Sequence, residues 1–231
     1  MTVAAGEALR RVDVVVGYKT YLDLIGDLLV GKDVVSSQMM KEIERCKQAL
    51  DLAATGKMVG LVCGGDPGIY AMAGLVFEMA REYKYNCKIE IIAGLAAINS
   101  CAARLGAPLM HDFAAVSLSD LLTPWQVIKK RLQAVAMADF VTAIYNPKSK
   151  KRTEQIVAAR EIFLEYRSSD TPVGIVTAAT RENERVVITT LENMLENDIG
   201  MQSTLIIGNS QTFTWNDLMI TPRGYAKKYN L

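Results

Sequence analysis

The chain has 231 residues, of which half are hydrophobic and 22% are charged, and its formal net charge is +1. This balance is typical of a globular protein, and it provides no global charge that would favour nucleic acid or a membrane surface. No apolar run approaches the roughly 20 residues of a membrane span, and residues 1–11 lack the regions of a signal peptide. We therefore expect neither nucleic-acid nor membrane partners.

Short apolar strands alternate with amphipathic helices along the chain, which indicates an α/β fold with a mainly parallel sheet. In the first half of the chain, the predicted strands cover residues 12–16, 59–62 and 89–92. The predicted helices cover residues 5–11, 41–54, 69–81 and 96–105.

The alternation of strands and helices starts anew near Asp112–Ala114, so we expect two domains, residues 1–113 and 114–231. In the second domain, the predicted strands cover residues 116–118, 140–145, 173–177, 186–188 and 205–207. One helix should begin at Pro124 with Thr123 as its N-cap, and the others should cover residues 153–166 and 191–197.

The four cysteines are widely spaced, and the sequence has neither a CxxC motif nor a Cys/His cluster. This pattern favours buried free thiols in a reducing cytoplasm and gives no reason to expect a protein-bound metal. The cysteines are Cys46, Cys63, Cys87 and Cys101.

The most informative stretch is the glycine-rich turn Gly64–Gly68, which follows a predicted strand and precedes helix-compatible sequence from Ile69. Glycines let a ligand approach the backbone closely, and the start of a helix offers unpaired N–H groups. The turn contains Asp66 and no lysine, which fits a neutral or cationic ligand better than a triphosphate. A plain turn is the alternative interpretation.

Three further predicted strand ends carry small or polar residues, at 93–97, 145–147 and 177–180. Ligands bind at the carboxyl ends of strands in parallel sheets. Each of these segments could equally be an ordinary turn.

Other chemical signals are sparse. The only histidine, His111, is either a surface residue or a catalytic one, and no serine-hydrolase, zincin, Walker or dinucleotide motif occurs. Residues 146–152 form the densest positive cluster, either a solvated helix start or a clamp for carboxylates. Residues 117–120 place two hydroxyls and an acid after a strand, as a turn or as substrate contacts.

Four stretches share a pattern with known proteins: Val16–Tyr21, Gly64–Tyr70, Ser117–Trp125, and Ile144–Pro147 with Gly208–Thr212. They resemble the tetrapyrrole methylase family, whose members use S-adenosylmethionine (SAM) in corrin and siroheme synthesis. Ser117–Trp125 and Gly208–Thr212 resemble the branch that methylates C17 of precorrin-3B or cobalt-precorrin-3. The resemblance covers about residues 2–225.

The resemblance implies two α/β domains with the ligand in the cleft between them, and a homodimer. It implies that SAM is the cofactor and S-adenosylhomocysteine the product, with no protein-bound metal. Its SAM contacts carry over to Gly64, Gly65, Asp66, Ile69, Ala96, Ala97, Asn146 and Ala179.

The implied reaction is methylation of C17 in cobalamin biosynthesis, followed by contraction of the macrocycle. Ring contraction needs proton transfers, for which the candidates are Asp120, Ser117, Ser119 and His111. The substrate carries many carboxylates, and Lys148, Lys151 and Arg152 are the expected docking charges.

Family members begin with a strand and a GxGPG-type loop on the substrate side, whereas this chain begins with Met1-Thr2 and residues 1–11 contain no counterpart. The resemblance therefore predicts a first domain without that strand and loop. Two alternatives stay open: a tetrapyrrole methylase acting at C11 or C20, or a non-catalytic SAM-binding remnant.

Overall fold

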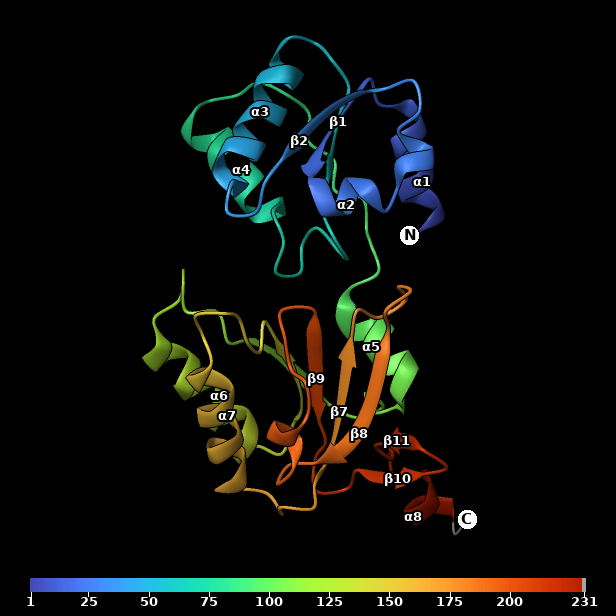
Figure 1. Cartoon of the computed structure of the whole chain (residues 1–231), viewed down its shortest axis with the longest axis vertical. Helices are drawn as coiled ribbons and strands as arrows, with labels where there is room; N and C mark the ends of the chain where they lie inside the picture. The colour runs from blue at the N-terminus through green and yellow to red at the C-terminus, as the bar shows by residue number, and fades with distance from the viewer. Residues whose placement is uncertain (230–231) are drawn as a thin grey trace. The chain divides into compact units, whose positions relative to one another are not determined.

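The computed structural model describes residues 1–229, and the chain divides into two units, Met1–Ala96 and Ala97–Leu231 (Figure 1). Both units combine helices with a sheet, which confirms the predicted α/β class. The division precedes helix α5 (Ala97–Leu105), whereas the sequence predicted it near Asp112–Ala114. The reason is that α5 packs on strands β7 (Pro172–Thr177) and β9 (Ser203–Ile207) of the second unit.

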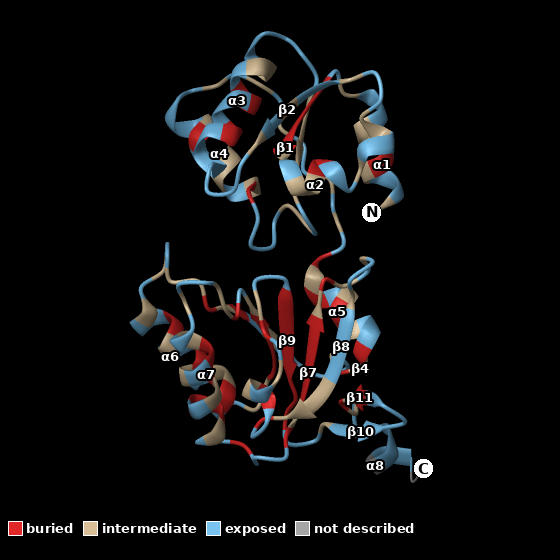
Figure 2. Cartoon of the chain, viewed as in Figure 1, coloured by how far each residue is buried: buried red, intermediate tan, exposed pale blue. Residues whose placement is uncertain are grey.

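Unit 1 is built on a three-stranded parallel sheet in the order β2-β1-β3. Its strands are β1 (Val14–Tyr18), β2 (Asp33–Ser37) and β3 (Val59–Val62). Its helices are α1 (Val3–Arg11), α2 (Lys19–Asp23), α3 (Glu42–Ala54) and α4 (Ala73–Glu82), with a 3-10 turn at Gly26–Leu28. The central strand β1 is the most deeply buried of the three (Figure 2).

A buried arginine connects α3 to the end of β2. The Arg45 guanidinium donates to Ser37 Oγ at 2.6 Å, to the Gln38 carbonyl at 2.8 Å and to Met72 Sδ at 3.1 Å. Because all three groups belong to segments that leave the carboxyl edge of the sheet or flank α4, the side chain ties these segments together.

The strand predicted at residues 89–92 is wrong, because residues 85–96 contain neither helix nor strand. A strand needs a hydrogen-bonded neighbour, and within residues 1–229 the sheet pairing of β3 is to β1 alone. The helix predicted from Ile69 begins later, at Ala73, because Tyr70 adopts a left-handed backbone with φ of 50°.

Unit 2 contains a five-stranded sheet in the order β5-β6-β9-β7-β8. Its remaining strands are β5 (Phe113–Ser117), β6 (Val141–Tyr145) and β8 (Arg185–Thr190). Only β5 and β6 pair in parallel, so the prediction of a mainly parallel sheet is wrong for this unit. Since β9 lies antiparallel between β6 and β7, the carboxyl ends of β5, β6 and β7 reach the same edge of the sheet.

Helices cover both faces of this sheet. Val173 and Ile175 join the cluster formed with α6 (Trp125–Met137) and α7 (Glu154–Leu164). The intervening Gly174 faces α5, since a Cβ there would lie 2.3 Å from Leu105 Cδ1. Pro124, not Thr123, is the N-cap of α6, and no side chain caps that helix.

A small second sheet completes unit 2, in the order β10-β11-β4. Its strands are Gly106–Ala107 (β4), Phe213–Trp215 (β10) and Leu218–Ile220 (β11), and Tyr225–Tyr229 forms α8. The helix predicted at residues 191–197 is reduced to a 3-10 turn, Met194–Glu196. Across residues 1–229, no helix has both the length and the apolar character that crossing a membrane requires.

Candidate functional site

In unit 1, Asp66 joins the glycine-rich loop after β3 to the segment before α5. Its Oδ1 accepts a hydrogen bond from Gly68 N at 2.8 Å, and its Oδ2 accepts one from Gly94 N at 2.9 Å. Each carboxylate oxygen therefore binds a backbone amide. This arrangement makes Asp66 a residue that shapes the loop.

Close backbone contact explains the glycines around Asp66. A Cβ on Gly94 would lie 2.0 Å from the carbonyl oxygen of Gly65, and one on Gly64 would lie 2.6 Å from the Tyr21 ring. Gly65 itself has φ of 81°, a conformation that favours glycine. The structure thus brings Gly64, Gly65 and Asp66 together with Gly94, which the set of predicted contacts did not include.

The same loop has unused hydrogen-bonding capacity. Gly64 and Gly65 are exposed, and within residues 1–229 the backbone N–H groups of Gly65 and Asp66 donate to no protein acceptor. Ile69 is 42% exposed, whereas Ala96 is buried. Such N–H groups on a glycine-rich loop fit a ligand that carries acceptor atoms.

In unit 2, the ends of the parallel strands β5 and β6 meet through side chains. Ser117 Oγ accepts hydrogen bonds from Asn146 Nδ2 at 3.0 Å and from Ser119 N at 3.2 Å. Asn146 holds a left-handed backbone with φ of 48°, which turns the chain sharply after β6. Ser117, Ser119 and Asn146 therefore form one polar cluster at the carboxyl edge.

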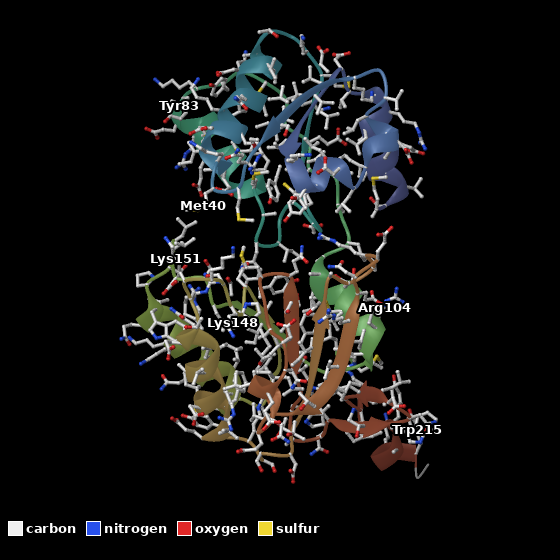
Figure 3. All side chains as sticks on the ribbon, viewed as in Figure 1. Met40, Tyr83, Arg104, Lys148, Lys151 and Trp215 are labelled. Carbon is white, nitrogen blue, oxygen red and sulfur yellow. The ribbon has the colours of Figure 1, made fainter. Side chains whose placement is uncertain are left out.

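Arg152 closes this cluster. Its guanidinium donates to the Asn146 carbonyl at 2.9 Å and to Ser119 Oγ at 3.5 Å. Lys148 is half-buried and Lys151 is exposed, on the same connection between β6 and α7 (Figure 3). Within residues 1–229, neither lysine forms an ion pair or a hydrogen bond, whereas Arg152 is directed onto the strand ends.

Asp120 lies beside the cluster and is held by α7, because its Oδ2 accepts a hydrogen bond from Gln155 Nε2 at 2.8 Å. Gln155 Oε1 is buried, and it accepts no hydrogen bond within residues 1–229. Gln155 was not among the predicted site residues. Its only sequence signal is its position in the first turn of a helix that follows the positive cluster.

His111 is not brought to this cluster. It precedes β5, while Ser117 ends that strand, so the two residues lie at opposite edges of the sheet. Its Nδ1 accepts a hydrogen bond from Asp112 N at 2.8 Å.

The turn that carries Ala179 lies at the carboxyl end of β7, on the same edge as Asn146. Ala178 and Thr180 on either side have φ of 51° and 66°. Glu184 accepts a hydrogen bond from Thr180 N, which lowers the pKa of its carboxyl. An ion pair of 2.9 Å joins Glu184 to Arg104 of α5.

The Gly208–Thr212 stretch has a structural role at the opposite edge. Ser210 donates to Asp139 from its backbone N at 3.0 Å and from its Oγ at 2.6 Å. Nearby, Arg167 is buried and donates to the carbonyls of Gly208 and Phe140. This stretch therefore supports the sheet and does not contribute to the polar cluster.

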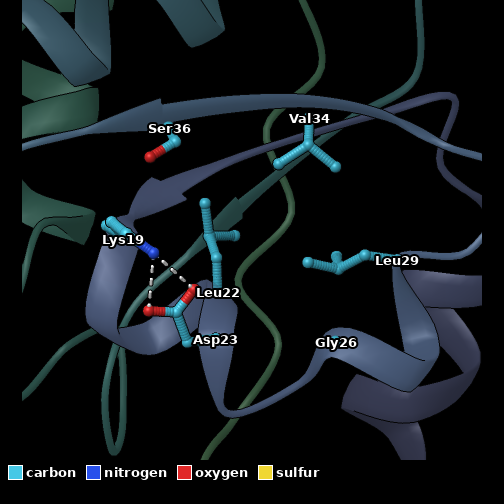
Figure 4. A pocket seen from close by; sticks show the side chains of 7 residues that line it. All are labelled: Lys19, Leu22, Asp23, Gly26, Leu29, Val34 and Ser36. Carbon is cyan, nitrogen blue, oxygen red and sulfur yellow. Dashed lines mark hydrogen bonds and ion pairs between the residues drawn. The ribbon is translucent and has the colours of Figure 1, made fainter.

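Two open hollows among the described residues of unit 1 contain none of the predicted site residues. The larger, about 440 Å³, lies between α2 and β2, where Lys19 and Asp23 pair at 3.0 Å (Figure 4). The smaller, about 360 Å³, is lined by residues of α3 and α4 and by Tyr83.

Comparison with known proteins identifies the family to which this chain belongs. The family model described as Tetrapyrrole (Corrin/Porphyrin) Methylases matches residues 1–195. A solved structure of the methyltransferase CobJ superimposes with a TM-score of 0.90 and 32% sequence identity, covering 96% of this chain and 93% of that one.

Two curated relatives carry more specific names. A cobalt-factor III methyltransferase of Priestia megaterium is 51% identical across all of this chain, which spans only 44% of that longer protein. A probable cobalt-factor III C(17)-methyltransferase of Salmonella typhimurium is 46% identical over 98% of this chain and 94% of its own length. The chain thus spans about half of some relatives and nearly all of others. It belongs to the family of tetrapyrrole (corrin/porphyrin) methylases.

Proposed function

We propose that this protein is a SAM-dependent methyltransferase of cobalamin biosynthesis that methylates C17 of a precorrin-3-level tetrapyrrole and promotes contraction of its ring. The observation that carries the proposal is the 46% identity to a probable C(17)-methyltransferase of nearly equal length. The relatives' names refer to cobalt-factor III, which favours the cobalt-containing substrate over precorrin-3B.

The chemistry requires alignment more than catalytic groups. SAM supplies an electrophilic methyl group: a carbon–carbon bond forms at C17, the carbon–sulfur bond breaks, and the electron pair stays on the sulfur of S-adenosylhomocysteine. Holding the reacting atoms in line contributes up to about 7–11 kcal/mol to lowering such a barrier. In this proposal, the loop built by Asp66 and Gly94 binds the cofactor through its N–H groups.

The charged groups beside the polar cluster of unit 2 are suited to the tetrapyrrole. Lys148 and Lys151 attract its carboxylates, and Asp120, held by Gln155, is the acid–base candidate that the geometry supports for ring contraction. His111 lies at the other edge of the sheet, so we leave it out of the proposed proton transfers.

Two properties extend the proposal. We propose a homodimer, which the family resemblance supports, and a cytoplasmic location, which the four free cysteines support. Light scattering on the purified protein tests the first, with an expected mass near twice the chain mass of 25.4 kDa.

The central test is titration calorimetry with S-adenosylhomocysteine, combined with a turnover assay on the tetrapyrrole. Wild-type protein should bind S-adenosylhomocysteine and transfer one methyl group, and NMR should locate it at C17. Methylation at C11 or C20 would assign a different member of the family, and binding without turnover would indicate a non-catalytic remnant.

The Asp66→Ala variant tests whether the glycine-rich loop binds the cofactor. Losing both amide contacts of Asp66 should weaken binding of S-adenosylhomocysteine at least tenfold while the protein stays folded. The matched control is Asp13→Ala, because Asp13 Oδ2 also accepts from a backbone amide, Met58 N at 2.9 Å, at the amino edge of the same sheet. Equal affinities in both variants would place the cofactor elsewhere.

A further inference from the structure

We propose that Tyr145 is a positioning residue for the cofactor, because its hydroxyl caps the first turn of α5 and so fixes Ala97. This inference rests on the proposed function and on the family resemblance, which carries SAM contacts over to Ala97 and Asn146. Tyr145 is not one of the SAM contacts that the resemblance implies.

The geometry at the start of α5 carries the inference. Ile98 N donates a hydrogen bond of 2.9 Å to the Tyr145 hydroxyl, and Ile98 is only 7% exposed. The first N–H groups of a helix have no partner within the helix. The residue ahead of the helix is Ala96, which has no side-chain acceptor, so the cap comes from the end of β6.

The rest of α5 is held by other contacts. Cys101 is buried, hydrogen-bonds Thr204 of β9, and burial raises the pKa of its thiol to about 11. Leu105 packs into the space left by Gly174, and Arg104 pairs with Glu184. These contacts fix the middle and the carboxyl end of the helix, whereas the Tyr145 hydroxyl holds its amino end.

The position of Tyr145 in the chain gives this contact a consequence for the site. Tyr145 ends β6 and Asn146 follows it directly, held by Ser117 and Arg152. One strand end therefore presents Asn146 and also anchors the turn that carries Ala97. The hydroxyl sets the spacing between two proposed cofactor contacts, which is a role in binding and not in the chemical step.

The test is Tyr145→Phe in the full-length protein, which keeps the ring and removes the hydroxyl. Hydrogen exchange should accelerate in a peptide covering residues 96–100 and stay unchanged elsewhere in α5. The Kd for S-adenosylhomocysteine and the KM for SAM should both rise about 3- to 10-fold, the size expected when the hydrogen bond from Ile98 N is lost, while kcat changes less than about twofold.

Two controls separate positioning from general destabilisation. Tyr85→Phe removes a tyrosine hydroxyl that donates to Asp51 in unit 1. Thr221→Val removes a hydroxyl contact to Thr212 of 2.8 Å within unit 2, on a segment that pairs beyond the carboxyl end of α5 and not at its amino end. Both variants should keep the wild-type Kd and KM, even where the unfolding temperature falls.

The outcomes distinguish this inference from the proposed function. If wild-type protein binds S-adenosylhomocysteine and Tyr145→Phe binds it equally well, the positioning role is wrong and the function stands. Unchanged exchange at residues 96–100 would also overturn it. If wild-type protein does not bind S-adenosylhomocysteine, the proposed function fails, whatever the exchange data show for the cap.

Discussion

At the scale of single residues, the glycine-rich loop of unit 1 depends on the missing Cβ atoms of its glycines as much as on its hydrogen bonds. Gly94 has no Cβ, so the Gly65 carbonyl can approach it, and the Asp66 carboxylate then reaches Gly94 N. Steric fit and hydrogen bonding act on the same few atoms. A change at any of the three should therefore disturb the others.

Gly94→Ala tests this packing. The added Cβ would lie 2.0 Å from the Gly65 oxygen and 3.0 Å from Asp66 Cα, and these backbone atoms cannot move as a flexible side chain can. We expect a loss of about 1–3 kcal/mol in the free energy of unfolding, typical of overpacking, measured by urea denaturation.

Gly74→Ala is the matched control, because it lies in helix α4 and a Cβ there would meet nothing within 4 Å. Alanine should stabilise that helix by about 0.5–1 kcal/mol. Equal destabilisation by both alanines would contradict the packing argument.

At the scale of elements, unit 2 is tied together by a buried arginine at the edge opposite the polar cluster. Arg167 donates to the carbonyls of Val135, Phe140 and Gly208, and its guanidinium lies 4.7 Å from the centre of the Phe163 ring. Burial lowers the pKa of Arg167 to about 10, so it remains charged at neutral pH. One side chain thus links the end of α6, the start of β6 and the end of β9.

Arg167→Ala should lower the free energy of unfolding by about 3–5 kcal/mol, because it removes the donor to the buried Gly208 carbonyl and to the partly buried Val135 and Phe140 carbonyls, together with the ion pair to Asp139. Thermal and urea unfolding followed by circular dichroism would measure the loss. Arg185→Ala is the control: that arginine is 73% exposed and pairs with Asp198 at 3.5 Å, so its removal should cost less than about 1 kcal/mol. Similar losses from both variants would argue against the buried network.

The elements that the sequence predicted well are those with strong local patterns. β3 has the predicted bounds, Val59–Val62, and α3 and α5 begin within one residue of the prediction. In each case apolar residues at regular spacing end at a glycine or a strand-to-loop change. Such signals depend on neighbours in the sequence, so they can be interpreted without knowledge of the fold.

The elements that were missed depend on distant partners. β2 reads as polar sequence, Asp33–Ser37, and becomes a strand only because β1 lies beside it. Conversely, residues 89–92 have the composition of a strand and no partner among residues 1–229. The antiparallel direction of β9 likewise follows from tertiary pairing, which no local pattern encodes.

The candidate site also combines residues that a local sequence pattern marks with residues that depend on distant contacts. Gly64, Gly65 and Asp66 stand out in the sequence because three glycines, an acid and a proline fall within five residues. Gly94 and Tyr145 fall within segments that the sequence marks as possible ligand sites, but their roles and that of Gln155 depend on contacts with residues far away in the chain, which no local pattern encodes.

At the scale of the whole molecule, the two units differ in how much apolar surface they bury. Among the described residues, a cluster of 17 buried residues surrounds the five-stranded sheet of unit 2. The described clusters of unit 1 are smaller, with four and three buried residues, and its strand β3 is only partly buried. Because opening is easiest where few apolar contacts are broken, the backbone of unit 1 should be the less protected.

Hydrogen exchange in increasing urea, followed by mass spectrometry, would measure this difference. Peptides from β1 and α3 should lose protection at lower urea than peptides from β7 and β9. The two destabilising variants sharpen the test, because each lies in one unit. Gly94→Ala should shift the loss of protection in unit 1 and leave unit 2 unchanged, and Arg167→Ala should do the reverse. If either variant shifted both sets of peptides equally, the chain would unfold as a single cooperative structure, and the separate cores would not set its local stability.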